Sequence, residues 1–211
     1  PFINDVIEAN IERNTEEKAS ANHAFVSNYR FNIEKCIDHL HHNIIGQKPA
    51  IDALEDILYR VKADMRTPNK PLAVCLLFGP TGVGKTQVIH SLAESVLGNA
   101  NALCRIDMIT LSQAHYSAAL SGAPPGYAGS KEHHTLFNIE AITGSYSKPG
   151  IVLFDEIEKA SNEVLRSLLA VLDHGSMTLS NGEKTIDFTN SLIFMTSNLG
   201  CESLLNRKLL T

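Results

Sequence analysis

Eight residues, GPTGVGKT at positions 79–86, combine three glycines with a lysine and a hydroxyl, and an apolar run, LAVCLLF, comes just before them. Gly79, Gly82 and Gly84 let the backbone curl so that N–H groups face phosphate oxygens, and a helix starting there would direct its positive end to the same point. Lys85 can reach the β- and γ-phosphates of a nucleotide, and the Thr86 hydroxyl can join a Mg²⁺ shell. The pattern GxxxxGK[ST] therefore predicts a nucleotide-binding loop rather than a glycine-rich structural turn, and its remaining members are Pro80, Thr81 and Val83.

A second polar group follows another apolar run, IVLFDE, at 151–156. Because the carboxyl ends of parallel strands lie together, Asp155 and Glu156 can meet the loop after Phe78. Asp155 can bind Mg²⁺ through water, and Glu156 can orient and deprotonate an attacking water. Asn198 ends the run SLIFMTSN and can hydrogen-bond a γ-phosphate or that water. Taken alone, the acids would be solvent-exposed and Asn198 a turn residue, but the phosphate loop favours the functional interpretation.

These groups need a scaffold that brings strand ends together, and the hydrophobic pattern predicts one. Continuous apolar runs, LAVCLLF among them, predict strands buried on both faces, and residues recurring every three or four positions predict helices between them. The predicted strands lie at 72–78, 102–107, 150–156 and 191–198, and the predicted helices at 33–40, 51–65, 85–97, 134–143 and 161–174. A hairpin is predicted at 176–188, with Asn181-Gly182 as a type I′ turn. The alternation favours an α/β fold, a doubly wound parallel sheet with helices on both faces.

Composition argues against several classes of protein. The chain has 211 residues, of which 44% are hydrophobic and 19% charged, and its formal net charge of −5 gives no basic field to attract nucleic acid. No apolar run approaches the ~20 residues of a membrane span, and no secretory signal opens the chain. We therefore expect a cytoplasmic protein with no membrane and no nucleic-acid partner.

Neither the cysteines nor the histidines have the spacing of a metal site. The four cysteines lack CxxC spacing, and we expect reduced thiols, which suit a reducing cytoplasm. The clusters HLHH and HH have no cysteine or carboxylate partner at ligand spacing, so solvated helix or loop faces are favoured over metal ligands. The residues concerned are Cys36, Cys75, Cys104, Cys201, His39, His41, His42, His133 and His134.

Seven motifs follow one another in a recognisable order: NIIGQ, GPTGVGKT, RIDM, GAPPGYAG, VLFDEIEKA, VLDHGSMT and IDFTNSLIFMTSNLG. In order and spacing they resemble Clp-type AAA+ ATPases over residues 33–200, and most of all the second ATPase module of the ClpA, ClpB and ClpC unfoldases and disaggregases. The resemblance implies the P-loop NTPase fold of an AAA+ large subdomain, with ATP and Mg²⁺ as cofactors. It also implies a homo-oligomeric ring, a hexamer, that threads protein substrates through a central pore.

The resemblance also implies roles for single residues. Ile44 and Ile45 would line the adenine pocket, and Gly46 and Gln47 would mark the turn after them. Asn198 would be the sensor of the γ-phosphate, and Tyr127, within GYAG, would be the pore-loop aromatic that grips a polypeptide. The family usually has GYVGYEEGG and DFRN where this chain has GYAGSKEHH and DFTN, so substrate grip and the subunit interface are expected to differ.

The pattern predicts three parts of unequal size: a polar helical segment or linker at 1–30, the nucleotide-binding subdomain at 31–205 and a truncated tail at 206–211. Because the chain begins at Pro1, we interpret it as part of a longer protein. The family's helical lid and arginine finger do not follow TSNLG, and Arg207 lacks the finger's acidic partner. The isolated chain is therefore expected to be monomeric and weakly active.

ATP hydrolysis that drives protein unfolding is the function that these features favour. A nucleotide-sensing switch or scaffold with vestigial hydrolysis is the alternative, and the intact Lys85, Asp155, Glu156 and Asn198 argue against it. A nucleic-acid remodeller is a third hypothesis, which the acidic net charge and the aromatic GAPPGYAG loop disfavour.

Overall fold

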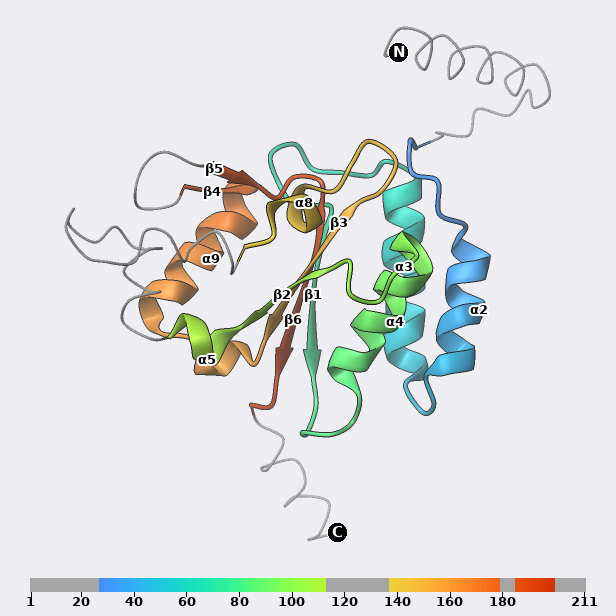
Figure 1. Ribbon diagram of the computed structural model, residues 1–211, viewed down its shortest axis with the longest axis horizontal. Coiled ribbons are helices and arrows are strands. Elements are labelled where there is room, and N and C mark those ends of the chain that lie inside the picture. The colour runs from blue at the N-terminus through green and yellow to red at the C-terminus, as the bar shows by residue number, and fades with distance from the viewer. Residues whose placement is uncertain (1–26, 113–136, 179–184, 200–211) are drawn as a thin grey trace, which may run out of the picture.

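A four-stranded parallel sheet forms the centre of the molecule (Figure 1). The computed structural model describes residues 27–112, 137–178 and 185–199. Within them the strand order is β1-β6-β3-β2, and each neighbouring pair is parallel. The strands are β1 (Ala73–Phe78), β2 (Cys104–Asp107), β3 (Gly150–Asp155) and β6 (Ser191–Ser197). Since sequential strands are not all neighbours, the chain must cross over the sheet between them.

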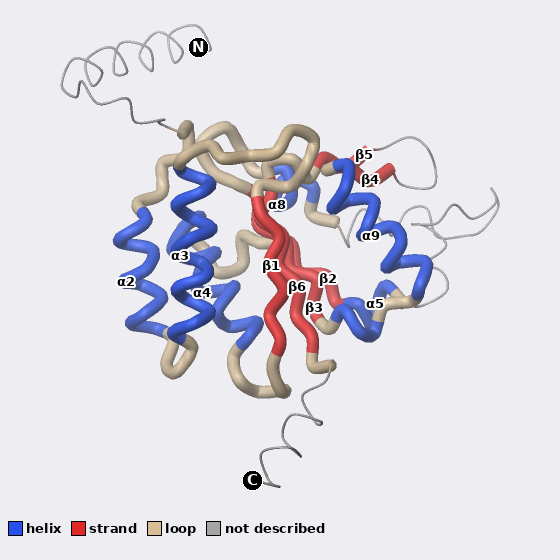
Figure 2. The backbone as a smooth tube through the Cα atoms, turned by 180° about the vertical axis from the view of Figure 1, so that it is seen from behind, coloured by secondary structure: helices blue, strands red, loops and turns tan. Residues whose placement is uncertain are grey.

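Helices cover both faces of this sheet, which confirms the predicted doubly wound α/β fold (Figure 2). One face carries α2 (Ile33–Asn43), α3 (Lys48–Lys62) and α4 (Lys85–Leu97), and the other carries α5 (Met108–Leu111), α8 (Ile139–Thr143) and α9 (Asn162–His174). Two short strands, β4 (Ser176–Thr178) and β5 (Thr185–Asp187), form the predicted antiparallel pair. A 3₁₀ turn, η1 (Ile157–Lys159), follows β3.

Alternate residues of the central strands contribute to two separate cores. Ile151 and Leu153 of β3 pack in the core with α2, α3 and α4, whereas Val152 and Phe154 pack in the core on the opposite face. All six residues of β3 are buried. A strand covered on both faces needs apolar side chains at every position, which explains the unbroken run in the sequence.

The structure corrects the prediction that the first strand is buried on both faces. β1 lies at the edge of the described sheet, and alternate side chains are exposed: Val74 by 42%, Leu76 by 41% and Phe78 by 62%. Cys75 and Leu77, between them, pack against the core with α2–α4. An apolar run predicts a strand, but its burial depends on the strand order, which is a tertiary property.

Helix ends follow the local chemistry of the chain. α4 and α9 end at Gly98 and Gly175 with φ of 85° and 64°, left-handed values that glycine adopts readily, and Ser161 Oγ accepts a hydrogen bond from the amide of Val164 at the start of α9. The sequence predicts a helix that continues to residue 65, but α3 ends at Lys62 and the side chain of Met65 is 71% exposed.

Several predictions lie outside the described residues. These are the polar segment up to residue 26, the loop that contains Tyr127, the Asn181-Gly182 turn and the tail after Leu199. In the part of the chain that the structure describes, no helix combines the length and hydropathy needed to cross a membrane.

Candidate nucleotide-binding site

The predicted site residues gather at the carboxyl edge of the sheet. Phe78, which precedes the phosphate loop, pairs in register with Ser197 of β6, and Asp155 at the end of β3 pairs with Asp107 of β2. The glycine loop follows β1 directly, Glu156 follows β3, and Asn198 follows β6. The parallel sheet therefore brings together residues that are more than a hundred positions apart in the sequence.

The phosphate loop has open space above its backbone. Gly82 and Gly84 have φ of 85° and 94°, and a Cβ added at either position meets no atom within 4 Å. Gly84 is the N-cap of α4 and, because it has no side chain, leaves the first N–H groups of that helix without a side-chain acceptor. Free N–H groups at a helix N-terminus suit a phosphate, so the loop fits the nucleotide that the sequence predicts.

Lys85 joins the phosphate loop to β6. Its Nζ donates hydrogen bonds to the carbonyl oxygens of Gly79 at 2.6 Å and Pro80 at 3.0 Å, and to Asn198 Oδ1 at 2.7 Å. An ammonium group has three donors, so all three are used by the protein itself. The ammonium group and the amide that the sequence assigns to one site are thus in direct contact.

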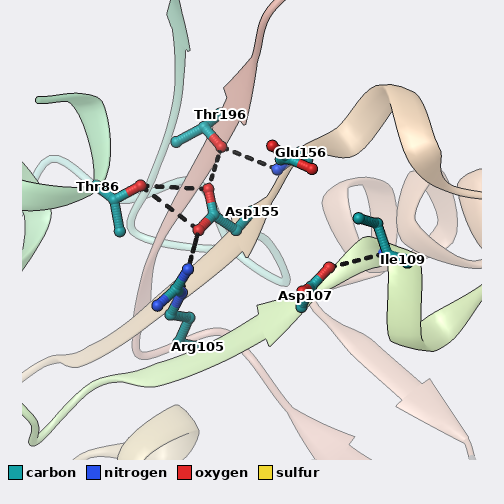
Figure 3. A network of polar contacts seen from close by, with 7 residues as sticks. All are labelled: Thr86, Arg105, Asp107, Ile109, Asp155, Glu156 and Thr196. Atoms are coloured by element: carbon teal, nitrogen blue, oxygen red, sulfur yellow. Dashed lines mark hydrogen bonds and ion pairs between the residues drawn. The ribbon is translucent and has the colours of Figure 1, made fainter. Parts of the chain in front are cut away.

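Asp155 lies at the centre of a polar network (Figure 3). Its side chain is only 9% exposed, although the chain around it is at a strand end. Oδ1 accepts a hydrogen bond from Thr196 Oγ1 at 2.5 Å, and Oδ2 accepts two from Arg105, at 3.0 Å from Nε and 2.6 Å from Nη2. The Thr86 hydroxyl lies farther away, at 3.3 and 3.4 Å from the two oxygens.

These contacts keep the Asp155 carboxylate ionised. Burial raises the pKa of Asp155, but the hydrogen bonds from Thr196 and Arg105, the Arg105 charge and the Thr86 hydroxyl together outweigh burial and lower the pKa below its ordinary value. An ionised carboxylate beside a hydroxyl is a suitable donor set for Mg²⁺, which prefers oxygen ligands. Asp155 and Thr86 therefore fit the predicted metal.

Glu156 follows in an unusual backbone conformation, with φ 58° and ψ 56°. Its amide donates to Thr196 Oγ1 at 2.9 Å, so β6 contacts both acids. A second contact joins the same two segments: the backbone N–H of Asn198 donates a hydrogen bond to Glu158 Oε1 at 3.1 Å.

The NIIGQ turn lies beside the phosphate loop. Gln47 Nε2 donates to the carbonyl oxygen of Val83 at 2.9 Å. Of the two residues predicted to line an adenine pocket, Ile44 is buried in the core and Ile45 is 94% exposed. A solvent-exposed isoleucine next to the phosphate loop is available to contact a base, whereas the side chain of Ile44 packs mainly against the protein.

Sequence reasoning missed three polar residues of this site. The sequence places Arg105 in a strand, Glu158 in the motif VLFDEIEKA and Thr196 at a strand end, but it does not predict their contacts. The sequence carries no signal for the Arg105 contact, because Arg105 is about half exposed and an exposed charge needs no protein partner. Tyr127, the predicted pore-loop residue, lies outside the described residues.

A parallel sheet with a glycine-rich loop between β1 and α4 defines a P-loop NTPase of the α/β class. Comparison with protein families is more specific: the AAA domain (Cdc48 subfamily) matches residues 70–210. This match covers more than half of the chain, and the chain belongs to the AAA family, as a Clp-type AAA+ ATPase domain. The resemblance seen in the sequence is thereby confirmed.

Curated relatives support the same family. An "ATP-dependent protease ATP-binding subunit-like protein AmiB" of Pseudomonas aeruginosa is 46% identical over 215 residues, covering 94% of this chain and 58% of the relative. A similarly named protein of Rhodococcus erythropolis is 50% identical over 165 residues, 78% of this chain and 47% of its own length. "Chaperone protein ClpB" of Aquifex aeolicus is 44% identical over 173 residues, 82% of this chain and 17% of the relative. The chain thus spans between about a sixth and three fifths of the relatives it matches.

Proposed function

We propose that this chain binds ATP with Mg²⁺ and hydrolyses it. The observation that supports this most directly is the contact network at the carboxyl edge of the sheet, where Lys85 contacts Asn198 and Thr86 contacts Asp155. An ammonium group, a hydroxyl, a carboxylate and a side-chain amide come from three separate segments, namely the start of α4, the end of β3 and the end of β6, and meet beside an open helix N-terminus. Phosphoryl transfer depends mainly on such positioning and electrostatics.

Each of these residues has a proposed role. The loop of residues 79–86 binds the phosphates, with Lys85 donating to the β- and γ-phosphate oxygens. Thr86 and Asp155 hold the metal, Asp155 through water. Glu156 orients the attacking water and accepts its proton, and Asn198 contacts the γ-phosphate or that water. When bound, ATP supplies the phosphoryl group and Mg²⁺ neutralises the charge that develops on it.

The Lys85 contacts suggest how ATP binding is coupled to β6. The ammonium group of Lys85 donates to its own loop and to Asn198. Phosphate oxygens would compete for the same three donors, and Asn198 Oδ1 would then be released or would remain beside the γ-phosphate. Ile45, exposed beside the loop, is proposed to contact the adenine base, with Ile44 supporting it from the core.

At the level of the whole protein, we propose a hexameric ring that threads protein substrates through its pore. The support is the family and the names of the relatives, which include a chaperone and ATP-binding subunits of ATP-dependent proteases. Tyr127 is the residue proposed to grip the substrate. We propose that its substrates are polypeptides. Any protease partner would degrade the polypeptides that the ring unfolds.

Two substitutions separate binding from hydrolysis. Lys85→Ala should weaken ATP binding at least about tenfold, because a charged hydrogen-bond donor to phosphate is lost. Glu156→Gln should leave ATP binding within about threefold of the wild type and reduce hydrolysis by about 100-fold or more, since a general base contributes about 10²–10⁴ in rate. Binding is measured with a fluorescent ATP analogue and hydrolysis by phosphate release. Lys70→Ala, which removes an exposed lysine outside the site, is the matched control for Lys85.

A nucleotide-sensing switch would give another result. In a switch with vestigial hydrolysis, Glu156→Gln would behave like the wild type in both assays, and the hydrolase proposal would be refuted. The pore role is tested separately in the complete gene product: Tyr127→Ala should abolish unfolding of a fluorescent protein substrate and leave ATP hydrolysis in place. Tyr146→Ala, at a tyrosine that is 70% exposed on the loop between α8 and β3, is its control.

A further inference from the structure

One buried hydroxyl contacts both acids of the site. Thr196, at the end of β6, is 1% exposed. Its Oγ1 accepts a hydrogen bond from the Glu156 amide at 2.9 Å and donates one to Asp155 Oδ1 at 2.5 Å (Figure 3). The directions are determined by the chemistry, because an amide N–H can only donate and an ionised carboxylate can only accept. A single atom of the neighbouring strand β6 therefore contacts both acids.

The backbone of Glu156 needs such a contact. A residue with a Cβ rarely adopts the left-handed region, and Glu156 is one of three non-glycine residues with positive φ in the described part of the chain. The other two, Asp64 and Asn69, lie in the connection between α3 and β1, far from the acids in sequence. The hydrogen bond from the Glu156 amide to Thr196 holds the turn that directs Glu156 away from the line of β3.

A second contact makes the link between these segments reciprocal. Asn198 lies two residues beyond Thr196, and Glu158 lies two residues beyond Glu156. The backbone N–H of Asn198 donates a hydrogen bond to Glu158 Oε1. The end of β6 and the turn after β3 thus hold each other through one hydroxyl and one carboxylate. Asn198 also contacts Lys85, so the same strand end reaches the phosphate loop.

We infer that Thr196 is a positioning residue for ATP hydrolysis, which sets the Asp155 carboxylate and the Glu156 turn relative to the phosphate loop. This inference rests on the proposed function. Thr196 is not expected to touch the nucleotide, the metal or the attacking water, and it acts through the two acids. Its loss should therefore affect the rate of hydrolysis more than the affinity for ATP.

The test compares Thr196→Val with Thr196→Ser. Valine keeps the branched shape and removes the hydroxyl, whereas serine keeps the hydroxyl and removes a methyl group. Thr196→Val should lower kcat about tenfold, the effect of losing one buried hydrogen bond in the positioning of the acids, and leave the Kd for ATP within about threefold. Thr196→Ser should restore kcat to within about twofold of the wild type.

A second measurement does not depend on activity. The exchange of the Glu156 amide proton, followed by NMR, should become at least about tenfold faster in Thr196→Val and return towards the wild-type rate in Thr196→Ser, because only the hydroxyl accepts this proton. A purely structural role would speed exchange throughout β3 and β6 rather than at Glu156 alone.

Ser191→Ala is the matched control. Ser191 begins the same strand, is equally buried, and donates from its hydroxyl to the carbonyl oxygen of Ile142 at 2.6 Å. Its substitution removes a buried hydrogen bond at the edge of the sheet opposite the acids, so it should lower the free energy of unfolding to a similar extent and leave kcat and the Glu156 amide unchanged.

Three results would overturn the inference: a kcat in Thr196→Val no lower than in Ser191→Ala, an unchanged Glu156 amide, or a Thr196→Ser variant as slow as the valine variant. A failure of the proposed function is distinguishable from these. If the wild-type chain neither binds nor hydrolyses ATP, the proposed function fails, and the amide exchange alone decides whether Thr196 holds the Glu156 turn.

Discussion

Arg105 directs both of its hydrogen bonds to a single oxygen, Oδ2 of Asp155, at 3.0 and 2.6 Å. The Thr86 hydroxyl, by contrast, lies 3.3 Å or more from the same carboxylate. A carboxylate has about four lone-pair positions, and the three short contacts use most of them. The weakest contact is therefore the one with Thr86, the residue proposed to share a metal with Asp155, and this is the contact that a metal-bound water can replace at the smallest cost.

The first prediction concerns the stability that Arg105 provides. Arg105→Gln should lower the free energy of unfolding at pH 7 by about 1–2 kcal/mol, because a nearly buried carboxylate loses its charged partner, while the half-exposed guanidinium limits the effect. Urea denaturation measures it. Arg66→Gln is the control: Arg66 also pairs with an aspartate, Asp64, but both side chains are about half exposed, and its loss should change stability by less than about 0.5 kcal/mol.

The second prediction is the pH dependence of that difference. The pKa of Asp155 is lower in the folded state, so the unfolded state binds more protons between the folded value and the ordinary value of about 4. The stability that the ionised carboxylate contributes is complete above about pH 4 and is lost as the pH falls through the folded pKa. The difference between the wild type and Arg105→Gln should accordingly shrink below about pH 4. A difference that stays constant down to pH 2.5 would show that Arg105 acts through packing rather than charge.

The third prediction uses the two ends of α4. Gly84 and Gly98 flank this helix with φ of 94° and 85°, and an added Cβ meets no atom within 4 Å at either position. Gly84→Ala and Gly98→Ala should therefore each cost about 1–2 kcal/mol of stability through backbone strain. Only Gly84→Ala should weaken ATP binding, by at least about tenfold, since the strain moves the N–H groups that face the phosphates. Equal ATP affinity in both variants would exclude the proposed geometry of the loop.

The fourth prediction concerns the turn before α3. Gln47→Ala removes the hydrogen bond to the Val83 carbonyl oxygen and should weaken ATP binding about three- to tenfold, because the loop loses one of its supports. Isothermal titration calorimetry measures the affinity. Asn43→Ala removes a comparable exposed hydrogen bond, from Asn43 to His39 at 2.9 Å, and should leave the affinity unchanged. If both variants bind ATP like the wild type, the turn does not support the loop.

The fifth prediction compares an edge strand with a central one. Leu76→Ala in β1 should cost less than about 1 kcal/mol, because Leu76 is 41% exposed, whereas Leu153→Ala in the fully buried β3 should cost about 2–5 kcal/mol. Thermal and urea unfolding give both values. A large loss at Leu76 would mean that this face of β1 is covered in solution.

Local chemistry made much of the fold predictable. The ends of α4 and α9 follow from Gly98, Ser161 and Gly175, and the four strands follow from apolar runs. The place of each strand in the sheet could not be read in the same way, because LAVCLLF at the edge and GIVLFD at the centre have the same pattern. Strand order is decided by how the helices pack, and with it the exposure of Leu76 and Phe78.

Polar contacts between segments that are distant in the sequence are the second feature that the sequence does not predict. The motifs predict Lys85, Asp155 and Asn198 as a group, and the structure places Lys85 in contact with Asn198 and Asp155 beside Thr86. The roles of Arg105 and Thr196 depend on which residue of β2 or β6 stands beside Asp155. Which residues face Asp155 is decided by the pairing register of the strands, and no short sequence motif predicts this register.

The register of β6 has a consequence for when the refolding chain regains its activity. Neighbouring residues of a strand point to opposite faces, so a slip of one position would present Met195 or Ser197 where Thr196 now meets the acids, and would draw Asn198 away from Lys85 at the same time. Such a chain would still have a sheet, helices and a nearly normal circular dichroism spectrum. ATP hydrolysis should therefore be recovered late during refolding, after most of the secondary structure has formed.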